Sequence, residues 1–231
     1  MLDVRAGGQV VRALAAALST VGTLALSACT DGASTGAGTA TTPRPSPSAS
    51  AGAGLLAQLR AGGVIIVLRH AATDRFQMDA DERTGPGAGP VNFEDCSTQR
   101  NLSKQGRADA RTIGEAFRKL RIPIGTVWTS PYCRSRSTAD LAVGRAEVIN
   151  GLERLYPERD VAADRRISQL IRAQAPTVGE PNMMISGHGV YPSVLDPAVT
   201  LREGEAALYV LRGNDVVLLG QVTPDAWARL G

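Results

Sequence analysis

Short apolar runs alternate with longer amphipathic stretches over the last three quarters of this chain. Val64–Leu68 is a continuous apolar run rich in β-branched residues, which is typical of a strand buried on both faces. Ser103 can cap a helix that reaches about Leu120, because apolar residues recur there every three or four positions. The two periods together predict a mixed α/β domain.

Further strands and helices follow in alternation, which favours a three-layer α/β sandwich. We expect a mostly parallel central sheet with helices on both faces and an antiparallel hairpin near the C-terminus. The predicted elements are strands at Thr126–Thr129, Glu147–Ile149 and Asn182–Ile185, helices from Ser130 to Val143 and over Arg165–Gln174 (Ile167, Leu170 and Ile171 inward), a hairpin of Ala206–Leu211 with Val216–Val222, and a short helix opened by Thr223-Pro224-Asp225.

The first 28 residues have the pattern of an export signal. Arg5 and Arg12 precede an apolar stretch of roughly 14 residues, and the small residues before Cys29 suit cleavage. Leu26-Ser27-Ala28-Cys29 resembles a bacterial lipobox, which implies a lipid on Cys29. The alternative is an uncleaved membrane anchor, for which the apolar stretch is short. We therefore expect an exported protein, held by lipid on the outer side of the cytoplasmic membrane.

Residues 29–54 consist almost wholly of Thr, Ala, Ser, Gly and Pro. Such a composition buries too little apolar surface to offset the entropy lost on ordering, so we expect a disordered tether. Residues 55–231 remain as one globular domain, which is long enough for a substantial core.

The charge of the chain does not indicate a nucleic-acid partner. The formal net charge is +3, and lysine occurs only at Lys104 and Lys119. Arginine supplies nearly all the positive charge, but no arginine run is interleaved with aromatic residues. We expect no nucleic-acid binding.

The two histidines of the chain each follow a predicted buried strand. His70 comes directly after Val64–Leu68 and Arg69, and His188 follows the strand at Asn182–Ile185. Ligands of open α/β sheets bind at this carboxyl edge. A neutral imidazole beside arginine side chains, here Arg69 and Arg134, can accept a phosphoryl group while the guanidinium groups hold its oxygens.

Several motifs in order resemble the histidine phosphatase superfamily, its phosphoglycerate-mutase-like group. The resemblance covers roughly Val64 to Trp227. It rests on Arg69-His70-Ala71-Ala72-Thr73, on Arg100 to Gly106 with Ala110 and Ile113-Gly114, on Ser130-Pro131-Tyr132-Cys133-Arg134 with Thr138-Ala139, and on Gly187-His188-Gly189.

The resemblance implies that His70 is the nucleophile and forms a phosphohistidine. Arg69, Arg134 and His188 would then surround the phosphate, and Thr73 would donate its hydroxyl to it. It implies no metal and no cofactor, and the sequence has no cluster of residues with metal-ligand spacing.

The general acid is left open between two carboxylates. Glu153 follows the third predicted strand, where mutase-like relatives have a glutamate, and Asp74 lies four residues after His70. The aspartate that acid phosphatases and phytases place after their second histidine is replaced by Gly189. Many mutase-like members have an asparagine where this chain has Phe76, so a phosphate contact is missing or supplied elsewhere.

Once Cys29 is lipidated, two cysteines remain. An even number in an exported protein suggests a Cys96–Cys133 disulfide, the alternative being two unpaired thiols. The bond would fasten an insertion of about 25 residues between Thr73 and Cys96, which we expect to be a lid that faces the substrate.

Three functions are compatible with these features. The first is a metal-independent phosphoric monoester hydrolase of the histidine acid phosphatase type, acting outside the membrane on small phosphomonoesters or on phosphorylated wall or lipid precursors. The second is a binding module that keeps the phosphate pocket but lacks efficient turnover. The third, a mutase, is disfavoured because an exported protein has no evident supply of glycolytic phosphoesters. The phosphohydrolase is the leading hypothesis.

Overall fold

The computed structural model describes residues 49–153, 161–189, 195 and 199–230. The predicted signal segment, Cys29 and tether residues 29–48 lie outside this range. The elements follow one another as α1 (Ala49–Ala61), β1 (Ile65–Arg69), the 3₁₀ turns η1 (Ala80–Glu82) and η2 (Cys96–Thr98), α2 (Lys104–Lys119), β2 (Ile124–Thr129), α3 (Cys133–Val143), β3 (Glu147–Val148), α4 (Val161–Ala173), β4 (Asn182–Gly187), β5 (Ala206–Arg212), β6 (Asp215–Val222) and α6 (Pro224–Trp227).

The six strands form one sheet in the order β3-β2-β4-β1-β5-β6. The four strands from β3 to β1 run parallel, while β5 pairs antiparallel with β1 and with β6. The predicted α/β class, with its parallel sheet and C-terminal hairpin, is therefore confirmed. Among the described helices, none is long and apolar enough to cross a membrane.

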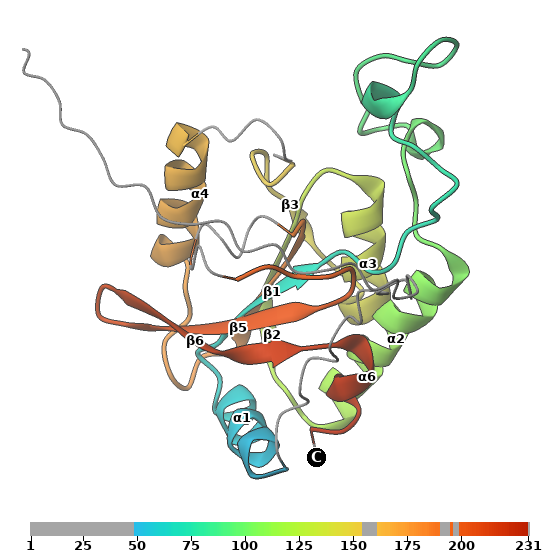
Figure 1. Ribbon diagram of the computed structural model, residues 1–231. Coiled ribbons are helices and arrows are strands. Elements are labelled where there is room, and N and C mark those ends of the chain that lie inside the picture. The colour runs from blue at the N-terminus through green and yellow to red at the C-terminus, as the bar shows by residue number, and fades with distance from the viewer. Residues whose placement is uncertain (1–48, 154–160, 190–194, 196–198, 231) are drawn as a thin grey trace, which may run out of the picture. The chain divides into compact units, whose positions relative to one another are not determined.

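Helices cover both faces of the sheet, because β1 sends alternate apolar side chains in opposite directions. Ile66 and Leu68 pack into a cluster with residues of α1, α2, α3 and α6, whereas Ile65 and Val67 pack with residues of α4. Figure 1 shows α4 apart from the other helices, across the sheet. Each face thus has its own core.

Helix α1 begins six residues before the expected domain boundary at residue 55, since it starts at Ala49. Leu56 and Leu59 bury their side chains in the core, which anchors the helix. Three of the six residues 49–54 are alanine, the best helix former, and the helix extends back into the segment expected to be tether.

Two other local predictions were wrong. Leu170 is 39% exposed, while Ile167 and Ile171 are buried. Leu170 lies about 100° around the helix from Ile171, which takes it off the inner face. Helix α3 begins at Cys133, with Tyr132 rather than Ser130 at the N-cap position. Ser130 uses its hydroxyl elsewhere, as described below.

Helices α2 and α3 approach each other at Gly114, where a side chain would collide with backbone. A Cβ atom placed there would lie 2.1 Å from the carbonyl oxygen of Ala142. We expect Gly114→Ala to lower the free energy of unfolding by about 1–3 kcal/mol, as overpacking does. Urea unfolding measures this change.

Gly54→Ala in α1 is the matched control, because nothing lies within 4 Å of its added Cβ. It should raise the free energy of unfolding by up to about 1 kcal/mol through helix propensity alone. Equal midpoints for the two variants would contradict the close approach of α2 to α3.

Candidate active site

The two histidines meet at the carboxyl edge of the sheet. Strands β1 and β4 are parallel neighbours in a register that pairs Arg69 with Gly187. The backbone N–H of His70 continues the ladder, donating to the carbonyl of Gly187 at 2.8 Å. The rings of His70 and His188 consequently lie 5.4 Å apart, centre to centre, in an edge-on arrangement.

His70 is held as a neutral imidazole with one nitrogen available. Its Nδ1 lies 3.0 Å from the carbonyl oxygen of Ala71, and because a carbonyl only accepts, Nδ1 carries the hydrogen. Nε2 therefore keeps its lone pair. Burial, followed by the positive charge of Arg134, lowers the pKa of His70 to about 3. The ring is in the state that a nucleophile requires.

His188 is buried beside it, and its Nε2 lies 3.0 Å from the hydroxyl oxygen of Ser130. This contact explains why Ser130 does not cap α3. Burial is also the main cause that lowers the pKa of His188 well below its usual value, with the charges of Arg134 and Arg69 adding to it. His188 is thus neutral at pH 7.

Arg69 extends from the end of β1, where Nη1 donates to the carbonyl of Leu201 at 2.8 Å. The residue after His188 leaves room for this side chain. A Cβ atom at Gly189 would lie 3.1 Å from Nη1 of Arg69 and 3.2 Å from the oxygen of Leu201. An aspartate here, as in the acid phosphatase branch, would crowd Arg69, so the substitution by glycine has a steric basis.

Arg134, in the first turn of α3, is almost wholly buried and is paired with an acid from the insertion. Its Nη1 lies 2.9 Å from both carboxylate oxygens of Asp79. The guanidinium carbon lies 4.0 Å from the ring centre of Tyr132, which supports it from the side. Asp79 also accepts the backbone N–H of Arg100 at 2.8 Å. One carboxylate therefore organises two arginine-bearing segments.

Three arginine side chains in this region have a buried Nε–H group without a hydrogen-bond partner. The Nε atoms of Arg69, Arg100 and Arg134 are buried without a hydrogen-bond acceptor among the described residues. The positive charges of all three lower the pKa of His188, and those of Arg69 and Arg134 lower that of His70. Buried donors are ordinarily satisfied, so these N–H groups are suited to binding an anion.

The start of helix α3 has few N–H groups left for such an anion. The N–H of its first residue, Cys133, donates to Oε1 of Gln99 at 2.8 Å. Ser135 and Arg136 donate back to the carbonyl of Tyr132. Three N–H groups of the first turn, those of Cys133, Ser135 and Arg136, are therefore already bonded within the protein.

A cavity of about 510 Å³ lies beside the segment that follows His70. Thr73, Arg100 and Glu203 are among the residues that line it. Thr73, which we expected to donate to phosphate, instead donates its hydroxyl to Oε1 of Glu203 at 2.7 Å and its N–H to Oε2 at 3.0 Å. Phe76 also lines the cavity and is 92% exposed, so it does not replace a buried phosphate contact.

The two expected acids differ in their surroundings. Asp74 lines the cavity and caps its own turn by accepting the N–H of Phe76 at 3.0 Å. Glu153 lies in the turn after β3 and accepts the N–H of Gly151. A catalytic role for either carboxylate stays a prediction.

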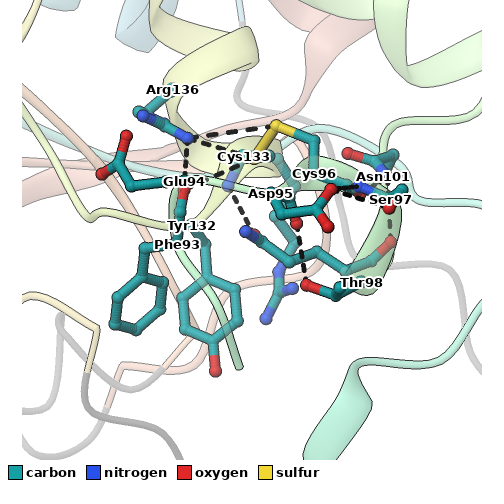
Figure 2. The surroundings of a disulfide bond; sticks show 12 residues. Phe93, Glu94, Asp95, Cys96, Ser97, Thr98, Asn101, Tyr132, Cys133 and Arg136 are labelled. Carbon is teal, nitrogen blue, oxygen red and sulfur yellow. Dashed lines mark hydrogen bonds between the residues drawn. A yellow bond between two sulfur atoms is a disulfide. The ribbon is translucent and has the colours of Figure 1, made fainter. Parts of the chain in front are cut away.

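The disulfide expected from the cysteine count is present, joining Cys96 of η2 to Cys133 at the start of α3 (Figure 2). Arg136 lies next to it and donates to the carbonyl oxygen of Phe93 at 2.6 Å. The bond therefore fastens the end of the insertion beside Arg134.

Sequence reasoning did not identify Asp79 or Glu203 as site residues. Asp79 lies in an insertion with two further acids nearby, Asp81 and Glu82, and nothing in the sequence singles it out. Glu203 is separated from His70 by more than 130 residues and reaches it through the pairing of β5 with β1. Both residues belong to the site only through tertiary contacts, and no sequence motif marks either of them.

Removing the carboxylate of Asp79 should leave Arg134 buried without a counter-charge. We expect Asp79→Ala to lower the free energy of unfolding by about 3–5 kcal/mol, measured in urea. Added inorganic phosphate should restore part of this loss. Arg229→Ala, which breaks the exposed pair with Asp225, is the control and should cost about 0–1 kcal/mol. Similar losses in both variants would contradict the burial of the Asp79–Arg134 pair.

The neutral histidines should make stability depend on pH. The unfolded chain binds a proton at His70 near pH 6.5, while the folded chain excludes it down to about pH 3. The free energy of unfolding should therefore fall as the pH drops below 6.5, approaching about 1.4 kcal/mol per pH unit for each such histidine. Urea unfolding between pH 6.5 and 5 measures the slope. His70→Asn should reduce it, and an unchanged slope would contradict the neutral state of His70.

The chain is similar to one protein family and to several solved structures. The sequence profile of the histidine phosphatase superfamily (branch 1) matches residues 65–189, more than half of the chain. Among solved structures, a tungstate complex of the protein histidine phosphatase SixA is 16% identical, with 70% of this chain and 97% of that chain covered and a TM-score of 0.47.

A second similar structure is phosphoserine phosphatase from Entamoeba histolytica in complex with 3-phosphoglyceric acid. It is 13% identical, covers 68% of this chain and 95% of that chain, and has a TM-score of 0.48. Among curated proteins, no sequence matches this chain. The profile match spans both histidine motifs and confirms the resemblance seen in the sequence. The chain belongs to the histidine phosphatase superfamily, branch 1.

Proposed function

We propose that this protein is a phosphoric monoester hydrolase that transfers a phosphoryl group to His70 and then to water. One observation carries the proposal: a neutral histidine with a free Nε2 lies within the electrostatic reach of Arg69 and Arg134, and the Nε–H groups of Arg69, Arg100 and Arg134 are buried without a partner among the described residues. Membership of the superfamily supports the same chemistry. No step requires a metal ion or a cofactor.

In the first step, the phosphate of a phosphomonoester binds beside His70 and accepts hydrogen bonds from the buried Nε–H groups. Its oxygens receive hydrogen bonds from Arg69, Arg100 and Arg134, whose fixed charges offset the charge that builds up in the transition state. Nε2 of His70 attacks phosphorus, the bond from phosphorus to the ester oxygen breaks with its electron pair on that oxygen, and the oxygen takes a proton from water in the cavity as the alcohol leaves.

The surroundings of His70 favour this transfer. Phosphorylation of Nε2 gives the ring a positive charge, and the carbonyl of Ala71, which accepts the Nδ1–H, stabilises that charge. His188 lies beside His70, and its Nε2 is next to the Ser130 hydroxyl. The Nε2–H group can donate to the serine oxygen, and the serine hydroxyl can donate in turn to a phosphate oxygen. The cavity lined by Thr73 and Arg100 receives the leaving alcohol.

The place of action is proposed from the sequence alone. The export signal and lipobox at residues 1–29 put the domain outside the cytoplasmic membrane, anchored through lipid on Cys29. The disulfide between Cys96 and Cys133 suits an oxidising compartment. Substrates would then be phosphomonoesters outside the membrane.

The proposal is tested with p-nitrophenyl phosphate in the presence of EDTA. We expect the purified protein to release p-nitrophenol, and His70→Ala to lower kcat/KM by at least about 10³-fold, because the nucleophile is lost. An alkaline quench should recover acid-labile phosphate on the wild-type protein and none on the variant. Circular dichroism checks that the variant is folded.

Two outcomes would overturn the proposal. Turnover that survives in His70→Ala would place the nucleophile elsewhere. A folded wild-type protein that binds inorganic phosphate but neither turns over nor becomes phosphorylated would be a binding module, the alternative considered from the sequence.

A further inference from the structure

Glu203 is attached to the nucleophile segment by backbone hydrogen bonds on its C-terminal side. The N–H of Gly204 donates to the carbonyl of His70 at 2.8 Å and to that of Arg69 at 3.2 Å. The N–H of Arg69 donates in turn to the carbonyl of Glu205 at 3.0 Å. The backbone that carries Glu203 therefore has a fixed position next to His70.

The side chain of Glu203 is fixed as well. Both carboxylate oxygens accept hydrogen bonds from Thr73, one from its hydroxyl at 2.7 Å and one from its N–H at 3.0 Å. Each oxygen still has a lone pair, and the half-buried carboxylate contributes to the lining of the cavity with Arg100. The free lone pairs are available to a molecule in that cavity.

The electrostatics of the site keep this carboxylate ionised. Burial raises the pKa of Glu203, but the two bonds from Thr73 and the charge of Arg69 outweigh burial, so the pKa lies below its usual value. The negative charge of Glu203 acts in turn on His70 and raises its pKa, against the larger effects of burial and of Arg134. An ionised carboxylate can accept a proton at neutral pH but has none to donate.

The second half of the proposed reaction needs such a group. After the alcohol leaves, water can take its position in the cavity, on the side of phosphorus opposite to Nε2 of His70. Attack by neutral water is slow unless a base removes a proton, and a positioned base contributes about 10²–10⁴-fold.

We propose that Glu203 is the general base that activates water to hydrolyse the phosphohistidine. The water oxygen bonds to phosphorus, one water proton passes to the Glu203 carboxylate, and the bond from phosphorus to Nε2 breaks. Its electron pair returns to Nε2, which leaves His70 neutral with Nδ1–H intact, and inorganic phosphate departs. Glu203 then releases its proton to solvent. This inference rests on the proposed function.

The other two acids near the site have different surroundings. Asp74 bonds within its own turn, to the N–H of Phe76, and Glu153 accepts the N–H of Gly151 after β3. Of the three acids, Glu203 is the one whose neighbour in sequence, Gly204, is hydrogen-bonded to the backbone of His70 in the described structure. Its position next to His70 distinguishes it.

Glu203→Gln tests the role, because glutamine keeps the shape and one acceptor of the side chain but is not a base. With p-nitrophenyl phosphate, rapid-quench mixing should show a burst of about one p-nitrophenol per protein molecule, followed by slow turnover. Phosphorylated protein should accumulate, and its breakdown should be at least about 10²-fold slower than in the wild type. In Glu203→Ala, added formate should speed this breakdown by supplying a small external base.

Glu180→Gln is the matched control. Glu180 accepts the N–H and the hydroxyl of Thr177 at 2.7 Å and 2.9 Å, the same pair of bonds that Thr73 gives Glu203, but just before β4 begins. It should turn over like the wild type and show no accumulation.

The outcomes separate this inference from the proposed function. If Glu203→Gln turns over normally, or loses turnover without accumulating phosphorylated protein, Glu203 is not the base for the second step. If the wild-type protein itself gives neither turnover nor phosphorylated protein, the proposed function fails first.

Discussion

The parallel pairing of β1 with β4 is the constraint on which the site depends. Both strands are buried on both faces, β1 over Ile65–Leu68 and β4 along its length, so a shift by one residue would exchange their side chains between two differently packed cores. The register that follows pairs Arg69 with Gly187 and places both histidines just beyond the last rung. Side chains from distant parts of the sequence then collect around a fixed pair of rings.

Burying so much positive charge at one edge of a sheet has an electrostatic cost that the protein reduces in two ways. The histidines lose their protons, which removes two charges from the neighbourhood of three guanidinium groups. Asp79 supplies a negative charge inside the cluster, and Glu203 another on the side of the cavity. The remaining excess is positive, which suits a doubly charged phosphate.

The sequence was sufficient for features that have a local cause. The Ser103 cap of α2, the hairpin of β5 with β6 and the position of His70 and His188 all follow from short-range patterns, and the structure has each of them. Ser130 shows the limit of such reasoning, because a serine before a proline also suits a helix cap. Its hydroxyl contacts His188, which lies 58 residues away in sequence.

Glu203 and Asp79 could not be found in this way, since their roles come from partners. A glutamate between an arginine and a glycine looks like a solvated loop residue. Only the hydrogen bonds between its segment and the end of β1 show that it lies next to His70. The same holds for Gly189, whose missing side chain makes room for Arg69.

The disulfide connects two segments that each carry a buried arginine. Arg100 lies four residues after Cys96, and Arg134 directly follows Cys133, so the covalent bond brings two guanidinium groups to one place before any anion arrives. Ordering these segments is then completed during folding instead of during binding. An incoming phosphate meets a preorganised site, and its binding free energy is not reduced by the entropy of closing a loop. Reducing agents in the medium would therefore change affinity for the anion as well as the stability of the fold.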